Sequence, residues 1–217
     1  MQLIEFFFAH TDALGATLFC LLALMSLLSW GCIFAKSISL WQLFQRARGF
    51  QQSFWGADRD TALAASHPFA RLARISLQVH EEVARTGSGK EEDLLLRCMN
   101  RVVGEEGARL DNGQTLLATV AAVAPFIGLF GTVWGVHNAL AAIGNAGAAS
   151  LEQIAGPVGE ALIMTALGLA VAIPALLAYN AFSRSSQHLL AELDALAHDL
   201  HHYLITGQPL PACVREG

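Results

Sequence analysis

The sequence has few charged residues for its length. Only 14% of its 217 residues are Asp, Glu, Lys or Arg, and 54% are hydrophobic, whereas a soluble domain carries about a quarter charged residues. Three stretches with at most one charged residue are long enough to cross a bilayer core about 30 Å thick. They cover residues 13–35, 115–143 and 156–180. This composition argues against a soluble globular protein and predicts an all-α integral membrane protein with three transmembrane helices.

The sequence also lacks the short motifs of common enzymes. It contains no His-Glu-x-x-His, no Gly-x-Ser-x-Gly and no glycine-rich phosphate loop ending in Lys-Ser/Thr. The spans contain no Asp, so an intramembrane aspartyl protease would lack its catalytic carboxylates. The four cysteines have no metal-ligand spacing, and the basic residues are not interleaved with aromatic residues. We therefore expect no enzyme activity, no cofactor, no metal and no nucleic-acid partner.

The distribution of basic residues predicts the orientation in the membrane. The segment between the first two spans, 36–114, holds eleven of the thirteen Lys and Arg residues, and the link 144–155 holds none. Basic residues close to a membrane favour its cytoplasmic side, so we expect the N-terminus outside and the C-terminus inside. Residues 1–12 would then be a short periplasmic segment without a cleaved signal peptide, and 144–155 a periplasmic link.

The segments expected in the cytoplasm have helical patterns. In 36–114, helical periodicity breaks at His67-Pro68, and a capping box at Ser88–Glu91 opens a helix that we expect to run directly into the second span. After the third span, leucines repeat every three or four residues, which predicts an amphipathic helix over 181–206. Gly207 would end that helix, and 207–217 would form a flexible tail.

One acidic residue stands inside the predicted spans, at the start of the third. Glu160 lies within about one turn of that start. A charged residue at the bilayer centre costs about 2.5–3.5 kcal/mol on insertion scales, so such residues are usually functional. Two interpretations stay open. Glu160 carries or gates a proton or another ion, or it caps the helix start and reaches water, since an acid suits the first turn of a helix.

Polar residues on the second span complement those on the third. In a symmetric antiparallel hairpin, Thr132 and Thr165 would share one level near the bilayer middle, and His137 and Glu160 a shallower one. The threonines could line a pore, or each could bond the backbone of its own helix. His137 could titrate together with Glu160, or it could be a satisfied histidine at the interface.

Small residues and prolines in these two spans predict close helix packing and kinks. Gly128, Thr132, Gly135 and Ala139 form a stripe of small residues, and such stripes let helices approach closely in lipid. Proline in a transmembrane helix frees a carbonyl, which is tolerated inside a bundle. The positions assigned to packing or kinks are Pro125, Gly128, Gly131, Gly135 and Pro174.

A group of histidines lies near the C-terminus. His198, His201 and His202 stand at i, i+3 and i+4 beside Asp194 and Asp199. This spacing could hold a metal, but it is also typical of a solvated helix face, which we favour.

Two motifs in the second and third spans resemble those of the MotA/TolQ/ExbB proton-channel family. Residues 124–135 read Ala-Pro-Phe-x-Gly-Leu-Phe-Gly-Thr-Val-Trp-Gly, and residues 159–169 read Gly-Glu-Ala-Leu-x-x-Thr-Ala-x-Gly-Leu. The resemblance is strong over about 110–182, and within the family the motifs are most similar to those of ExbB members. By motif position, Glu160 matches the family's intramembrane glutamate, and Thr132 and Thr165 match its pore threonines.

The resemblance implies a function and partners. It implies a homopentamer in the inner membrane of a Gram-negative bacterium, with two transmembrane helices of the partner ExbD in a central pore. Protons flowing inward would drive rotation, and TonB would pass the work to outer-membrane importers. The essential proton-binding Asp would belong to ExbD, which leaves Glu160 as an entry or relay point. A TolQ-like role in envelope maintenance and a passive membrane scaffold are the alternatives.

Overall fold

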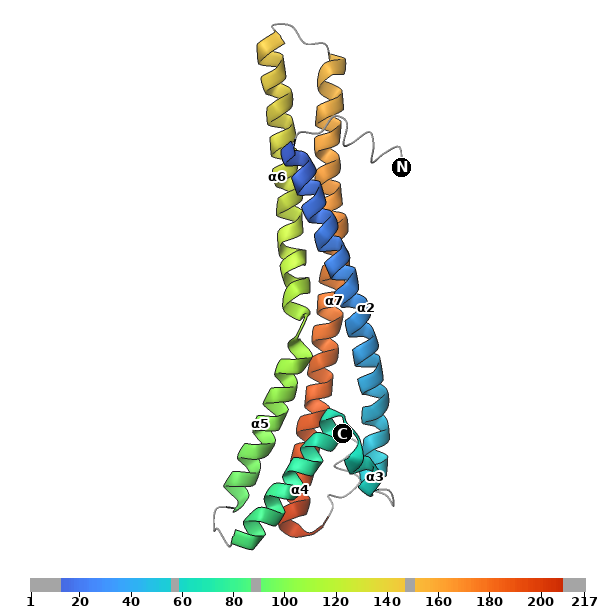
Figure 1. The fold of residues 1–217 in the computed structure, drawn as a ribbon, viewed down its shortest axis with the longest axis vertical. Helices are drawn as coiled ribbons and strands as arrows, with labels where there is room; N and C mark the ends of the chain where they lie inside the picture. The colour runs from blue at the N-terminus through green and yellow to red at the C-terminus, as the bar shows by residue number, and fades with distance from the viewer. Residues whose placement is uncertain (1–12, 56–58, 87–90, 147–150, 209–217) are drawn as a thin grey trace. The chain divides into compact units, whose positions relative to one another are not determined.

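The computed structural model describes residues 13–55, 59–86, 91–146 and 151–208, and these are helical apart from short turns (Figure 1). Three helical stretches are long and apolar enough to cross a membrane: Ala13–Ala47, Glu92–Ala141 and Ala155–Thr206. They have 35, 50 and 52 residues, and a span needs only about 20. The helices are α2 (Ala13–Phe54), α3 (Arg59–Ala64), α4 (Pro68–Thr86), α5 (Glu91–Asp111), α6 (Gln114–Ala146) and α7 (Leu151–Thr206). The predicted all-α fold with three apolar helices is confirmed.

The chain divides into two compact units, and the first contains the apolar spans. This membrane unit comprises residues 1–36 and 113–181. Its core joins α2, α6 and α7 through Leu22, Ala124, Met164 and Ala172, each at most 5% exposed. Large apolar side chains on the outside, such as Phe126 and Leu177, are 70% and 65% exposed. An apolar exterior of this kind suits contact with lipid or with other membrane helices.

The second unit comprises residues 37–112 and 182–217, and we call it the polar unit. Here α4 is strongly amphipathic and packs against α5 and α3. The periodic leucines predicted on the last helix are buried, as are two phenylalanines and the apolar face of α5. Together with Leu72 of α4, the large side chains buried in this unit are Phe50, Phe69, Leu95, Met99, Leu189, Leu193, Leu196 and Leu200.

Two helices of the chain, α5 and α7, end at glycines. The end of α5 corrects the prediction of one continuous helix into the second span. The helix before the second span does not run directly into it, because α5 ends at Asp111 and α6 begins at Gln114. Gly113 lies between them with φ +84°, a left-handed conformation that strongly favours glycine. Gly207, with φ +72°, donates its N–H to the Tyr203 carbonyl at 2.9 Å. The prediction that Gly207 ends the last helix is confirmed.

Some predictions concern residues outside the described ranges. These are the N-terminal segment 1–12, most of the Ser88–Glu91 capping box and the end of the tail, 209–217. Of the predicted link 144–155, the structure describes helix up to Ala146 and again from Leu151. The helices therefore continue into the segment that the sequence predicts as a link.

Candidate functional site

The candidate site is built on a contact between α6 and α7 so close that their backbones touch. A Cβ added to Gly128 would lie 2.8 Å from the Met164 carbonyl oxygen and 3.0 Å from the Thr165 Cα. A Cβ added to Gly168 would lie 2.7 Å from the Ala124 carbonyl oxygen and 3.1 Å from the Gly128 Cα. Side-chain Cβ atoms do not occur this close to backbone atoms, so both positions require glycine.

The same contact continues over the following turns of the two helices. A Cβ on Gly131 would meet the Met164 side chain at 3.1 Å, and a Cβ on Gly135 would lie 2.8 Å from that of Ala161. The surroundings of Gly128, Gly131 and Gly135 therefore fit the helix-packing role that the sequence predicts for them. Within the described residues, helix α6 continues through Pro125 and α7 through Pro174.

Sequence reasoning did not single out Gly168, although a signal was present. Ala161, Thr165, Gly168 and Ala172 stand at i, i+4, i+7 and i+11, the same spacing as the small-residue stripe on α6. Two matching stripes on antiparallel helices predict that the stripes face each other. In the structure Ala161 and Ala172 are buried at 3% and 5% exposure, and Gly168 lies against Gly128.

The two threonines differ in how their hydroxyl groups are satisfied. The Oγ1 of Thr132 donates to the Leu129 carbonyl of its own helix at 2.7 Å. The Oγ1 of Thr165 is buried and has no hydrogen-bond partner within the described part of the chain. A helical threonine usually bonds the carbonyl one turn before it, so Thr165 stands out. Its hydroxyl is enclosed at the contact between α6 and α7 without a partner among the described residues.

The close contact also determines the relative depth of the threonines. Gly128 faces the stretch from Met164 to Gly168, Gly131 lies against Met164, and Gly135 lies against Ala161. In this register Thr132 and Thr165 lie within one turn of each other along the hairpin, close to the shared level that the sequence predicts. Both still belong to the pair of stripes through which α6 and α7 meet.

Glu160 and His137 lie near the same end of this contact but are not joined. Glu160 is half-buried and precedes Ala161, which packs against Gly135. Its carboxylate makes no hydrogen bond or ion pair with the described residues. His137 is exposed and stacks on Trp134, with ring centroids 5.9 Å apart and planes at 25°. Its Nδ1 is 3.3 Å from the Asn138 Oδ1, so the structure brings His137 to Asn138 rather than to Glu160.

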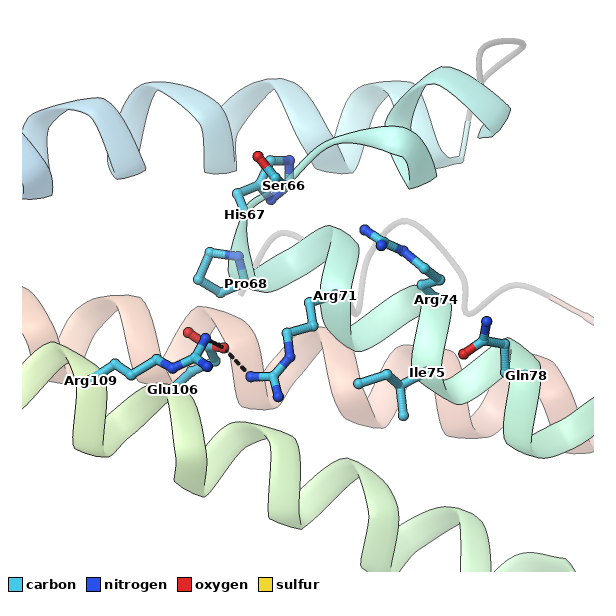
Figure 2. Close-up of a pocket in the computed structure, with 9 residues that line it drawn as sticks. All are labelled: Ser66, His67, Pro68, Arg71, Arg74, Ile75, Gln78, Glu106 and Arg109. Carbon is cyan, nitrogen blue, oxygen red and sulfur yellow. Dashed lines mark hydrogen bonds and ion pairs between the residues drawn. The ribbon is translucent and has the colours of Figure 1, made fainter.

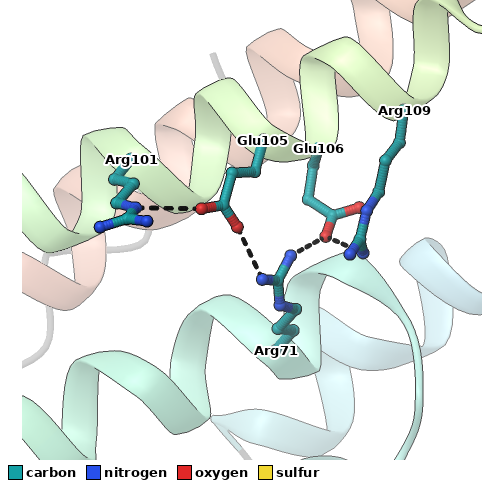
Figure 3. Close-up of polar contacts among 5 residues, drawn as sticks. All are labelled: Arg71, Arg101, Glu105, Glu106 and Arg109. Carbon is teal, nitrogen blue, oxygen red and sulfur yellow. Dashed lines mark hydrogen bonds and ion pairs between the residues drawn. The ribbon is translucent and has the colours of Figure 1, made fainter.

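The polar unit contains a charged cluster that sequence reasoning missed (Figure 3). Arg71 of α4 reaches two neighbouring carboxylates of α5, Glu105 at 2.7 Å and Glu106. Arg109 also bonds Glu106, at 2.9 Å, and Arg101 bonds Glu105, at 3.0 Å. The spacing of Arg101 and Arg109 from the two glutamates is visible in the sequence, but nothing in it shows that Arg71 joins them.

The electrostatics of this cluster favour its charged state. The Glu106 side chain is only 5% exposed, and two guanidinium groups compensate its charge. Hydrogen bonds from Arg71 and then Arg101 lower the pKa of Glu105, and hydrogen bonds to Glu106 and then Glu105 raise the pKa of Arg71. The stabilising effect of the Glu105 charge is therefore complete above the ordinary pKa of 4.5 and is lost progressively as the pH falls through the lowered pKa of the folded state.

We expect Glu106→Ala to destabilise the polar unit by about 1–2 kcal/mol, because a buried charge-assisted bond is lost and Arg71 keeps only one of its partners. In a chain of this size that corresponds to a fall in Tm of roughly 2–8 °C, measurable by circular dichroism in detergent. Glu82→Ala is the matched control. Glu82 pairs with Arg85 on the exposed face of α4, and its loss should change Tm by less than about 2 °C. Equal shifts for both variants would contradict a structural role for the cluster.

The histidines near the C-terminus remain on a helix face. The His198 Nδ1 lies 2.9 Å from the Asp194 carbonyl oxygen on the same helix, and the side chain is exposed. Among the residues that the structure describes, no three His, Cys, Asp or Glu side chains are grouped so that they could hold a metal ion. The solvated-face interpretation therefore fits His198, whereas His201 and His202 are partly buried and the Nε2 of His201 is enclosed.

The comparison with known proteins decides the family. The model of the MotA/TolQ/ExbB proton channel family matches residues 64–195, which include the glycine contact, Thr165 and Glu160. The chain belongs to this family. It is 41% identical over 198 residues to the biopolymer transport protein ExbB of Xanthomonas campestris pv. campestris (strain B100), covering 84% of this chain and 78% of that protein.

Two further relatives extend the comparison. The chain is 38% identical over 214 residues to the ExbB of Neisseria meningitidis (serogroup A, strain Z2491), covering 91% of this chain and 95% of that protein. It is 35% identical over 177 residues to the Tol-Pal system protein TolQ of Haemophilus influenzae, covering 73% and 74%. The chain is thus a multi-pass membrane protein of an ExbB/TolQ type, and it is more similar to these two ExbB proteins than to this TolQ.

Proposed function

We propose that this chain is the ExbB-type subunit of a proton channel that uses the proton motive force to energise TonB-dependent import across the outer membrane. Its partners would be ExbD, whose transmembrane helices would occupy the pore, and TonB. The imported cargo would be of the iron-siderophore, haem or vitamin B12 class. The two ExbB relatives, which cover 84% and 91% of the chain, support this assignment.

The observation that carries the proposal is a pair of unsatisfied polar groups on one apolar helix. On α7, the Glu160 carboxylate and the Thr165 hydroxyl both lack partners within the described residues. Keeping unpaired polar groups in an apolar span is costly, and the cost is explained if protons or a partner helix complete them. Five copies of the chain around a pore would place α6 and α7 of each copy beside such a helix.

The proposed orientation follows the basic residues. The segment 36–114, which holds eleven of the thirteen Lys and Arg residues and most of which lies in the polar unit, would face the cytoplasm. The link between α6 and α7 would face the periplasm. Glu160 stands nine residues after the start of α7 at Leu151, too far inside the helix to cap it. It would then lie toward the periplasmic side, where protons enter. Each proton that crosses 100 mV releases about 2.3 kcal/mol, so several protons per step suffice to drive a mechanical movement of a partner.

The hydroxyl of Thr165 gives a test of the pore role. We expect Thr165→Val to lower the rate of TonB-dependent uptake about tenfold, which corresponds to one polar contact of roughly 1.4 kcal/mol. Valine has nearly the same shape and removes only a hydroxyl that is unpaired in this chain, so the oligomer should stay assembled. Thr165→Ser should keep most of the uptake. Loss of the oligomer in Thr165→Val would instead show that the residue serves packing.

Thr132 offers a comparison within the same variant series. Its hydroxyl already bonds Leu129 of its own helix, so Thr132→Val should reduce uptake less than Thr165→Val does. Uptake of a radiolabelled iron-siderophore complex measures both variants.

The Tol alternative can be separated by complementation. The chain would be expressed with its genomic neighbours in a strain that lacks both ExbB and TolQ. The proposal expects restored uptake of iron-siderophore complexes that a protonophore abolishes, with sensitivity to deoxycholate unchanged. Restored deoxycholate resistance without uptake would assign the chain to the TolQ-like role.

A further inference from the structure

His67 is the N-cap residue of α4, an unusual position for histidine. Its Nδ1 accepts a hydrogen bond from the Ala70 N–H at 3.3 Å, and its carbonyl accepts the Arg71 N–H at 3.0 Å. An N-cap side chain must offer an acceptor to the first turn, and Ser, Thr, Asp and Asn are the usual choices. Histidine offers one at Nδ1 only when the ring is neutral and its proton is on Nε2. The cap on α4 therefore exists in one protonation state only.

The same ring also attaches the start of α4 to α2. His67 is 9% exposed, and its ring contacts that of Phe50 edge-on, with centroids 5.1 Å apart and planes at 85°. The Phe69 ring is 6.2 Å away, and Phe50 and Phe69 are 2% and 1% exposed. A charged imidazole is unfavourable among these buried phenylalanine rings. Protonation of His67 would therefore weaken both the N-cap hydrogen bond and the packing of α4 on α2.

The charges around His67 oppose its protonation. His67 borders two cavities of about 500 and 410 Å³, the larger of which is drawn in Figure 2. The only carboxylate lining either cavity among the described residues, Glu106, is already bonded to Arg71 and Arg109. Helix α3 contributes uncharged residues to the smaller one. The charged groups that line these cavities are Arg46 from α2, Arg71 and Arg74 from α4, and Glu106 and Arg109 from α5.

The direction of the pH effect follows from this environment. Burial, and then Arg46, lower the pKa of His67 below its ordinary value of 6.5. When α4 is unfolded, His67 takes up a proton near pH 6.5, whereas the folded state resists it. The stabilising effect of the cap is therefore complete above about pH 6.5 and is lost progressively as the pH falls through the lowered pKa of the folded state.

We propose that His67 is an acid-sensitive latch: protonation removes the acceptor for the Ala70 N–H and releases the first turn of α4 from α2. Its physiological meaning rests on the proposed function, because the polar unit would face the compartment into which protons are released. Protons released by the channel would acidify that compartment and loosen α4. The channel would thus be regulated by the protons that it transports. The latch itself is a property of the folded chain and needs no proton flow.

Hydrogen exchange of the full-length protein in detergent tests the latch. Protection factors of the α4 amides, corrected for the intrinsic pH dependence of exchange, are compared at pH 7.5 and 5.5. In the wild-type protein, the protection of the Ala70 and Arg71 amides should fall about fivefold at the lower pH, the size expected for loss of one N-cap. In His67→Asn, which keeps an acceptor that does not titrate, their protection should be equal at both pH values.

A matched control and a second measurement complete the test. His188→Asn replaces an exposed histidine of α7 that pairs with Glu192, and it should keep the fivefold fall. If His67→Asn does not fold, the ¹⁵N spectrum of histidine-labelled wild-type protein decides, because the latch requires the Nε2–H tautomer of His67 at pH 7.5. Equal wild-type protection at both pH values, an unchanged fall in His67→Asn, or an Nδ1–H tautomer would each overturn the proposal.

The latch and the proposed function can fail separately. The Glu160→Gln substitution lies in the membrane unit. A protein that carries it should show the same fivefold fall in hydrogen-exchange protection of the Ala70 and Arg71 amides between pH 7.5 and 5.5. A latch that persists in a chain without channel activity would leave the inference intact, and an active channel without the fall would refute only the latch.

Discussion

Glu160→Ala is expected to abolish proton-driven uptake while the oligomer remains assembled. Glu160 is the one Asp, Glu, Lys or Arg in the three predicted spans, so no other side chain of these types in this chain can take its place there. The carboxylate is half-buried and unpaired within the described residues, so its removal breaks no hydrogen bond or ion pair among them. We expect uptake to fall to the level seen with a protonophore, measured with an iron-siderophore complex in cells that depend on this chain.

The assembly state and the chemistry of the side chain make the Glu160 test specific. Glu160→Asp should recover part of the uptake because it keeps a titratable acid, whereas Glu160→Gln should behave like Glu160→Ala. Glu192→Ala, on the same helix but in the polar unit, is the control and should leave uptake near the wild-type level. Native mass spectrometry of each variant with ExbD reports assembly. Wild-type uptake by Glu160→Ala would support the passive-scaffold alternative.

The helices could be predicted from the sequence because their signals are local. The runs with at most one charged residue reflect the length of a bilayer crossing, and the leucine period after the third span reflects a helix face that becomes buried. The break before the second span is different. Gly104, Gly107 and Gly113 look alike in the sequence, yet the first two lie inside α5 and Gly113 alone of these three adopts a positive φ. At Gly113 the Cys32 Sγ donates to the carbonyl at 3.4 Å, a contact between residues 81 positions apart that no local pattern reveals.

The candidate site was predictable in its residues and less so in its geometry. The motifs pointed to Glu160, Thr132 and Thr165, but assigning shared depths assumed a hairpin symmetric about its link. The observed register is determined by the glycine contacts of α6 and α7, above all those of Gly128 and Gly168, where the two backbones touch. It keeps the threonines within one turn of each other, but the sequence alone does not show which residues make the contact. The Arg71 cluster and the His67 cap were not predicted, because each joins helices whose packing a sequence pattern does not reveal.

Gly168→Ala is expected to destabilise the membrane unit by about 1–3 kcal/mol, the usual cost of forcing an extra methyl group into a packed interior. The new Cβ would lie 2.7 Å from the Ala124 carbonyl oxygen, and a backbone atom cannot turn away as a flexible side chain can. The helices must then separate, which also disturbs Gly128 and Thr165 on the opposite sides of the contact. Tm in detergent, followed by tryptophan fluorescence, should fall by several degrees, and Gly128→Ala should act in the same direction.

Glycines without neighbours show whether this effect comes from the contact. Added Cβ atoms at Gly159 on α7 and at Gly31 on α2 would meet nothing within 4 Å. Alanine favours a helix over glycine by up to about 1 kcal/mol, so Gly159→Ala and Gly31→Ala should leave Tm unchanged or raise it. The same chemical change would thus have opposite signs at positions nine residues apart on one helix. A Gly168→Ala protein as stable as Gly159→Ala would show that the backbones of α6 and α7 do not touch there, and that another feature holds Thr165 in place.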